Sequence, residues 1–483
     1  MQQQSAEFGK IRSVLWPIHS YELKKFLPMA LMMMCILFNY SMLRSIKDAL
    51  VVTNMGAEVI PTIKLWFVLP AAVLFMVLYS KLSNIFSKNS VFYIITSTFW
   101  IYYFIFLTVL FPNVDAIQFK CESVSPMFCN IMKPIEGWVF SSFYIMSELW
   151  GSAMVSLMFW KFANDVTNLK EAKRFYAMFG FIANGALILS GAMLKKLNSV
   201  PLEIVLVLIS CALVIAIYWW LNTCVLTDAR FAKQEGEGSA KKKRVKMSLS
   251  DSFKYIISSK YLGFIALLVI CYGISINLVE VVWKGQIRLL YSTADEYNSF
   301  MGGLQTATGV ATIIFMLIGA NILRIFGWKI GAIITPVMIL VTGLTFFGFI
   351  IGRDSLESML NGYGINVLSF IVYLGLVQNV LAKATKYSLF DATKEMSYIP
   401  LDDELKSKGK AAVDVIGGRL GKSGGAAIQW LLLNVIFIGS NLIAITPIIT
   451  CIFVIIMIVW LYAVFGLNKE FVKVTSAQNQ AEK

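Results

Sequence analysis

The strongest constraint on this chain is a series of long apolar stretches that recurs along its whole length. A bilayer core of roughly 30 Å needs about 20 apolar residues per helix, so each stretch predicts one membrane span. Twelve spans are predicted, near residues 26–50, 62–82, 91–111, 135–162, 175–196, 202–224, 261–283, 298–323, 329–351, 365–386, 413–437 and 441–465. The predicted fold class is therefore an all-α polytopic membrane protein.

The composition supports this fold class and excludes a soluble one. The length of 483 residues would by itself suggest two or three soluble domains. With 58% hydrophobic residues, 14% charged residues and a mean hydropathy of +0.71, however, the chain has too few charges to cover a soluble surface. The net charge of +14 does not indicate nucleic-acid binding, because the basic residues lie between the apolar stretches.

The distribution of Lys and Arg predicts the orientation. Twelve spans place both termini on one side, and the segments on that side hold most of the basic residues, which predicts that this side is cytoplasmic. The predicted units are a cytoplasmic N-terminal segment (1–25), a first six-helix half (26–226), a basic cytoplasmic linker (227–260), a second six-helix half (261–465) and a cytoplasmic C-terminal tail (466–483).

The two halves show weak internal similarity, which favours a 6+6 arrangement of the major-facilitator type. Span 4 ends in Phe162-Ala163-Asn164-Asp165 and span 10 ends in Leu389-Phe390-Asp391, and each is followed by basic residues and a glycine-bearing span. In such transporters the halves rock around a site near the membrane midplane.

Ionisable residues inside apolar spans mark the predicted site, because each costs about 2.5–3.5 kcal/mol at the centre of a membrane helix unless it faces a cavity or a partner. They are Arg44, Lys47, Asp48, Glu148, Glu280, Lys284, Arg419 and Lys422. Two interpretations stay open for Arg44, Asp48 and Lys284, which either lie near a membrane surface or act as charges in the interior. Glu148 has about a dozen span residues on each side, which favours a functional role.

Lys47 and Lys422 come from different halves and are the predicted cations for an anionic cargo. Nucleoside di- and triphosphates carry about three to four negative charges, and a path for them through the membrane needs fixed cations. The glycines around Lys422 would allow a polyphosphate to approach the backbone closely. Glu148 and Glu280 would pair with the two lysines when the site is empty, so that an empty carrier crosses poorly and exchange is obligatory.

Longer motifs are spread over the chain from Lys24 to about Glu470. They are Leu43-Arg44-Ser45-Ile46-Lys47-Asp48, Glu148-Leu149-Trp150-Gly151-Ser152, Phe162-Ala163-Asn164, Glu171-Ala172-Lys173-Arg174-Phe175-Tyr176, Tyr272-Gly273-Ile274-Ser275-Ile276-Asn277-Leu278-Val279-Glu280, Lys386-Tyr387-Ser388-Leu389-Phe390-Asp391, Tyr398-Ile399-Pro400-Leu401-Asp402 and Leu420-Gly421-Lys422-Ser423-Gly424-Gly425. Together they resemble the nucleotide transporter family, the ATP:ADP translocases of obligate intracellular bacteria and plastids.

The resemblance implies site residues and a function. In that family two lysines and two glutamates of these motifs are associated with transport, and they correspond here to Lys47, Glu148, Glu280 and Lys422. Further candidates in or beside these motifs are Arg44, Asn164 and Arg419. The implied function is import of ATP in exchange for cytosolic ADP across a bacterial inner membrane. We expect a multi-pass monomer whose partners are the nucleotides and the bilayer, with no cofactor, metal ion or nucleic acid.

Three alternatives remain. The cargo could be GTP, CTP, UTP or NAD, because no residue is identified that reads the base; Phe143, Tyr144, Trp150 and Trp283 could stack it, although such aromatics are more often helix packing. A proton-coupled nucleotide symporter is the second alternative, because intramembrane carboxylates also serve as proton relays. An enzyme is disfavoured, since the single histidine, His19, lies outside the spans and no metal or nucleophile cluster occurs.

Two short patterns carry little weight. The run Gly421-Lys422-Ser423 is not a P-loop, because Ile416 stands where that motif requires glycine. Cys121 and Cys129 share one predicted outer loop, where a disulfide between them stays an open alternative.

Overall fold

The structure is a computed structural model that describes residues 16–119, 126–228, 259–401 and 417–481, together with residues 231, 409, 410 and 413. Within these ranges the chain is helical and contains no strand, in agreement with the predicted fold class. Most of the predicted basic linker, Cys121 and the side chain of Cys129 lie outside the described residues.

The first half consists of long helices that change in places into short 3-10 or π-helical segments. Its α-helices are α3 (Leu23–Met55), α4 (Ile60–Thr62), α5 (Leu69–Ile85), α6 (Lys88–Ile105), α7 (Val114–Ile117), α8 (Pro126–Glu136), α9 (Trp138–Trp150), α10 (Trp160–Val166), α11 (Leu169–Leu197) and α12 (Val200–Trp220). The remaining segments are η1 (Ser20–Glu22), η2 (Ala57–Val59), η3 (Ile63–Val68), η4 (Phe106–Leu110), η5 (Gly151–Phe159) and η6 (Leu221–Val225). Apolar sequences adopt helices in lipid because a helix satisfies its own backbone hydrogen bonds.

The second half repeats this pattern after the linker. Its elements are α14 (Lys260–Leu290), α15 (Ala294–Ile351), α16 (Arg353–Asn361), α17 (Val367–Thr385), η7 (Lys386–Phe390), α18 (Asp391–Ser397), α20 (Gly418–Leu431), η10 (Leu432–Ile436) and α21 (Leu442–Ala481). α15 contains two predicted spans, which meet at Gly327 with a φ of 75°. Glycine suits this position because a positive φ costs it nothing in side-chain clashes.

In the described residues every predicted span overlaps one or more helices, although fewer helices meet a strict apolar criterion. In the described ranges nine helices are long and apolar enough to cross a membrane. Three predicted spans fall outside this set. The first is α9 together with its continuation into α10, the second is α11, and the third is α20 together with η10. Two of them carry Glu148 and Lys422, so their polar content is part of the predicted site. The count of twelve membrane crossings therefore remains a prediction.

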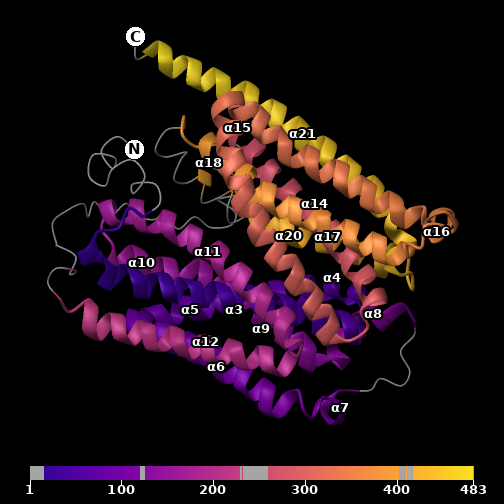
Figure 1. Cartoon of the computed structure of the whole chain (residues 1–483), viewed down its shortest axis with the longest axis horizontal. Coiled ribbons are helices and arrows are strands. Elements are labelled where there is room, and N and C mark those ends of the chain that lie inside the picture. Colours follow the sequence, from indigo (N-terminus) through magenta and orange to yellow (C-terminus); the bar gives the residue numbers. More distant parts are fainter. Residues whose placement is uncertain are drawn as a thin grey trace.

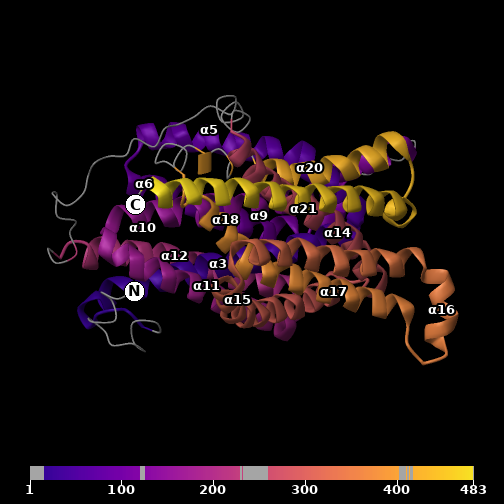
Figure 2. The same ribbon diagram turned by 90° about the horizontal axis from the view of Figure 1, so that it is seen from above.

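The first and the last long described helices begin and end at the same end of the helix bundle. In Figures 1 and 2 the start of α3 and the end of α21 lie toward one end of the long axis, and α16 lies at the other end. We call these the terminal end and the opposite end. α21 continues as a helix through Ala481, so most of the predicted C-terminal tail is helical.

The two halves contact one another closely toward the opposite end. α11 of the first half packs along the first part of α15 in the second half. A Cβ atom built on Gly302 would lie 2.6 Å from the carbonyl oxygen of Gly191, so the two backbones touch where these glycines cross. Small residues at such a crossing let membrane helices approach closely.

Polar groups reinforce this contact between the halves. Asp295 accepts a hydrogen bond from the backbone N–H of Val200 at 2.8 Å, and Asn298 donates one to the buried carboxylate of Glu203. Nearer the centre, Gln305 of α15 accepts from Ser41 at 2.6 Å and from Ser190 at 2.9 Å. Buried hydrogen bonds of this kind fix how two packed surfaces fit together. The halves are thus joined from the centre of the bundle to its opposite end.

Candidate functional site

Two ion pairs cross between the halves in the interior. On α3, Arg44 and Asp48 are one helical turn apart, and on α14, Glu280 and Lys284 have the same spacing. Arg44 Nη2 lies 3.0 Å from Glu280 Oε1, and Lys284 Nζ lies 2.8 Å from Asp48 Oδ2. Asp48 and Lys284 have exposed side-chain fractions of 1% and 2%. The structure therefore buries Asp48 and Lys284 inside the protein, whereas Arg44, which pairs with the buried Glu280, is 34% exposed.

Lys47 joins this cluster to α9. Its Nζ atom lies 2.9 Å from Asp48 Oδ1 and 3.0 Å from Glu148 Oε1, and 3.7 Å from the centre of the Tyr144 ring. The Lys47 side chain is 4% exposed, whereas that of Glu148 is 29% exposed. The predicted pairing of Glu148 with Lys47 is therefore present, and Glu148 is the more accessible partner.

Glu280 is surrounded by cations, and Lys422 is not among them. The Oε1 atom of Glu280 lies 3.0 Å from Nη2 of Arg44, 3.8 Å from Nζ of Lys383 in α17 and 3.9 Å from Nζ of Lys284. Lys422 is exposed and forms no ion pair with any described residue. The expected pairing of Lys422 with a glutamate is thus not formed, although Lys422 lies near enough to Glu148 to act on it electrostatically.

Two of the glycines next to Lys422 pack against α14. A Cβ atom on Gly421 would lie 3.1 Å from the Cα of Gly273, and one on Gly425 would lie 2.6 Å from the Cβ of Asn277. Both glycines therefore face α14 and allow α20 to pack against it, whereas a Cβ atom on Gly418 would meet nothing within 4 Å. Asn277 also donates to the backbone carbonyl of Lys422 at 3.0 Å, which fixes α20 in this position.

The remaining candidates lie apart from this cluster or outside the described side chains. Asn164 is exposed in α10, at the terminal end (Figure 1), where it accepts a hydrogen bond from Tyr176 at 2.7 Å. Arg419 belongs to the first turn of α20, but its side chain is outside the described part. Neither residue is brought into the central cluster by the described contacts.

The aromatic residues considered for base stacking are buried by helix packing. Trp150 donates to the carbonyl of Ile36 at 3.1 Å, and Trp283 donates to that of Val372 at 2.9 Å. Phe143 and Tyr144 are also inaccessible, with an exposed fraction of 0% each. All four rings are occupied by protein neighbours, so they offer no open face for a base.

Two further lysines belong to the cluster and were not among the predicted site residues. Lys64 lies in η3, where its Nζ atom is 3.3 Å from Asn277 Oδ1, and Lys383 lies on α17. Both act electrostatically on Glu280 and Lys284. Each is an ionisable residue within a predicted apolar span, so the rule that identified Glu148 would also have found them.

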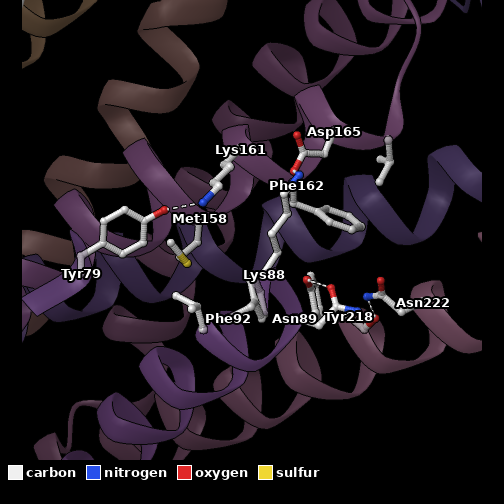
Figure 3. Close-up of a pocket in the computed structure, with 12 residues that line it drawn as sticks. Tyr79, Lys88, Asn89, Phe92, Met158, Lys161, Phe162, Asp165, Tyr218 and Asn222 are labelled. Carbon is white, nitrogen blue, oxygen red and sulfur yellow. Dashed lines mark hydrogen bonds and ion pairs between the residues drawn. The ribbon is translucent and has the colours of Figure 1, made fainter. Parts of the chain in front are cut away.

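A pocket lined by none of the residues of the charged cluster is shown in Figure 3. It has a volume of about 150 Å³, and its walls come from α5, α6, the α9–α10 helix and α12. Its charged and polar groups bind one another: Lys161 donates to Tyr79 at 2.8 Å, and Lys88 pairs with Asp165 at 2.8 Å. The described ranges contain no group of three His, Cys, Asp or Glu residues arranged to hold a metal ion.

Comparison with known proteins decides the family. The family model described as TLC ATP/ADP transporter matches residues 1–471. The chain belongs to this family. It is 47% identical over 503 residues to ADP,ATP carrier protein 1 of Chlamydia muridarum, covering 99% of this chain and 94% of that protein. It is also 47% identical over 482 residues to ADP,ATP carrier protein 1 of Rickettsia bellii, covering 96% of each.

Solved structures with the same fold are also membrane transporters. A bacterial homologue of the iron transporter ferroportin in an inward-facing state matches with a TM-score of 0.58 and 14% identity, covering 95% of this chain and 100% of that one. The nucleoside transporter NupG matches with a TM-score of 0.56 and 11% identity, covering 91% and 98%. At these identities the likeness concerns the fold alone. Family membership confirms the predicted resemblance, and with it a transporter of the ATP/ADP antiport type rather than an enzyme.

Proposed function

We propose that this TLC-family member imports ATP in exchange for ADP across a bacterial inner membrane and binds the nucleotide phosphates at the central cluster. The observation that carries the proposal is the interior network in which charges from both halves meet: Arg44 with Glu280, and Asp48 with Lys284. Lys47 and Lys422 are assigned as phosphate-binding cations, and Glu148 and Glu280 as the carboxylates that replace phosphate when the site is empty. Because both halves of one chain supply the site, a monomer is sufficient.

Displacement of a carboxylate by phosphate gives binding a route. In the empty site Glu148 neutralises Lys47 at 3.0 Å while remaining partly accessible. A polyphosphate oxygen can take the place of the Glu148 carboxylate beside Lys47, since phosphate and carboxylate accept the same charge-assisted hydrogen bonds from an ammonium group. Lys422, which is exposed and lacks an ion pair with the described residues, can then approach the cargo from the second half.

The same network explains why exchange would be obligatory. Removing one partner of a buried ion pair costs about 3–5 kcal/mol, because a charge is left without compensation. Moving the halves apart with no cargo present would expose or separate Asp48 and Lys284, which are bonded at 2.8 Å. Phosphate groups in the site would compensate the cations during that movement. The loaded carrier is therefore expected to switch much faster than the empty one.

The contacts between the halves suggest the state of the transporter. They join the centre of the bundle to its opposite end, through Gly191 and Gly302 and through Asn298 and Glu203. If the basic loops place the terminal end in the cytoplasm, as the distribution of Lys and Arg predicts, then this arrangement is closed toward the outside. ADP would enter from the cytoplasm in this state, and ATP would be released there.

Transport assays test both the exchange and its direction. Purified protein in vesicles preloaded with ADP should take up labelled ATP, and empty vesicles should not. Loading with GTP, CTP, UTP or NAD tests the other cargos, and an uncoupler tests proton symport. Intact cells of a bacterial host that lacks such an exchanger should import ATP when the protein is present in their inner membrane. Uptake into empty vesicles, or uptake abolished by the uncoupler, would contradict the proposal.

A further inference from the structure

Fixed cations outnumber carboxylates in the described central cluster. Its cations are Arg44, Lys47, Lys64, Lys284 and Lys383, and its carboxylates are Asp48, Glu148 and Glu280. Lys422 adds a further cation close to Glu148. Uncompensated charge in a membrane interior is costly, so an anionic ligand would stabilise the cluster in its charged form.

Lys64 is one of the cations without a carboxylate partner. Its Nζ atom donates to the amide oxygen of Asn277 at 3.3 Å, and no described carboxylate lies within ion-pair distance of it. The same Asn277 side chain donates to the backbone of Lys422 at 3.0 Å. Lys64 of the first half is therefore held beside the helix that carries Lys422 of the second half.

Lys383 is compensated only in part. Its side chain is 12% exposed, and its nearest carboxylate oxygen is Glu280 Oε1 at 3.8 Å. That oxygen already lies 3.0 Å from Arg44. A carboxylate that is shared among several cations compensates each of them incompletely, so Lys383 retains capacity to bind another anion.

We propose that Lys64 and Lys383, one from each half, bind the phosphate chain and set the charge of the nucleotide that the carrier accepts. This inference rests on the proposed function and adds a rule for specificity to it. With both lysines in place the cluster favours di- and triphosphates over a monophosphate, because the more highly charged cargo balances more of the excess positive charge. A structural role would make the two lysines necessary for folding, without any effect on the relative preference for ATP, ADP and AMP.

Removing the charge from either lysine should shift this preference. Lys64→Gln and Lys383→Gln keep a polar side chain of similar length but remove one positive charge. We expect each substitution to lower the affinity for ATP by about tenfold or more, the affinity for ADP by less, and the affinity for AMP least. The reason is that a charge-assisted hydrogen bond from lysine contributes more to the binding of a more highly charged phosphate chain. Lys64→Arg and Lys383→Arg should keep the order of preference. Lys81→Gln, at an exposed position on α5, is the matched control and should leave it unchanged.

Two measurements on the full-length protein separate the outcomes. The first measures the concentration of unlabelled ATP, ADP or AMP that inhibits the exchange of labelled nucleotide in vesicles by half. The second follows the thermal stabilisation of the purified protein by ATP, ADP, AMP, inorganic triphosphate and inorganic phosphate, which reports binding without transport. An unaltered order of preference in both glutamine variants would overturn the inference and leave the proposed function intact. Wild-type protein that is stabilised by triphosphate but exchanges no nucleotide would contradict the proposed function, and loss of that stabilisation in the variants would still support the inference.

Discussion

Asp48 of α3 and Lys284 of α14 form an ion pair at 2.8 Å that joins the two halves in the interior of the protein. Asp48 also lies 2.9 Å from its neighbour Lys47, so one carboxylate compensates a cation from each half. Arg44 and Glu280 form a second pair across the same boundary, one helical turn away and with the signs reversed. The central contact between the halves therefore combines these ion pairs with the hydrogen bonds of Gln305.

Neutralising Asp48 should destabilise the protein through the cations that it leaves behind. Asp48→Asn is expected to cost about 3–5 kcal/mol, because Lys284 and Lys47 then lose a buried partner. Replacing Lys284 with Met as well should recover part of this loss, since one of the uncompensated charges is removed. Thermal unfolding of the two variants in detergent measures the difference. A double variant that is less stable than Asp48→Asn would show that the pair does not act in this way.

Loss of this ion pair should also uncouple exchange. The Asp48→Asn, Lys284→Met carrier has no Asp48–Lys284 charge pair to break when it switches empty, so its unloaded form should switch faster. Vesicles loaded with labelled ADP and placed in nucleotide-free medium should then lose label several times faster than vesicles with the wild-type protein. If vesicles with the double variant and vesicles with the wild-type protein lose label equally slowly, obligatory exchange depends on contacts other than the Asp48–Lys284 pair.

Lys47 and Lys422 should respond differently to replacement by alanine. Both changes are expected to raise the KM for ATP by about tenfold or more, because each removes a charged contact to phosphate. Lys47→Ala should in addition lower the unfolding temperature, since Glu148 and Asp48 lose a partner at 3.0 Å and 2.9 Å. Lys422→Ala should leave the unfolding temperature near that of the wild type, because Lys422 is exposed. Neither Lys→Arg change should restore full transport, because a planar guanidinium presents its donors differently from an ammonium.

The glycine crossing offers a steric test of the closed end. In Gly302→Ala the new Cβ would lie 2.6 Å from the carbonyl oxygen of Gly191, so α11 and α15 have to separate. The variant should therefore spend more time open at the opposite end. Labelling rates of a cysteine placed beside this crossing, probed with a membrane-impermeant thiol reagent, should increase. Gly303→Ala is the control, because a Cβ there meets nothing within 4 Å, and an equal increase in both variants would contradict the explanation.

The helices could be predicted from the sequence because length and apolarity are local properties. The span predicted at 26–50, for example, is contained in α3, which runs from Leu23 to Met55. The kink at Gly327 was predicted only as a gap between two spans, because the conformation of one glycine depends on how the flanking helices pack. A hydropathy profile does not indicate which residues adopt a positive φ.

The charged residues of the site could be found in the same way, but their partners could not. Glu148 stands out because it interrupts an apolar span, and its pairing with Lys47 fits the expected scheme. Glu280, however, pairs with Arg44 and the nearby Lys383 and Lys284, because α3, α14 and α17 meet in the interior. Which helices meet is set by packing over the whole bundle, and a single sequence does not specify it. For the same reason the sequence does not show which glycines near Lys422 pack against α14, as Gly421 and Gly425 do.

The central position of the charged cluster has a consequence for how membrane voltage acts on exchange. In a rocking mechanism the fixed charges stay near the midplane, so the voltage acts on the difference between the two cargos, about one negative charge for ATP against ADP. A potential that is negative inside opposes ATP entry by about 2.3 kcal/mol per charge for each 100 mV. In the proposed direction of transport, nucleotide gradients would have to drive ATP import, and a cell that spends its ATP quickly would maintain inward flow against its own voltage.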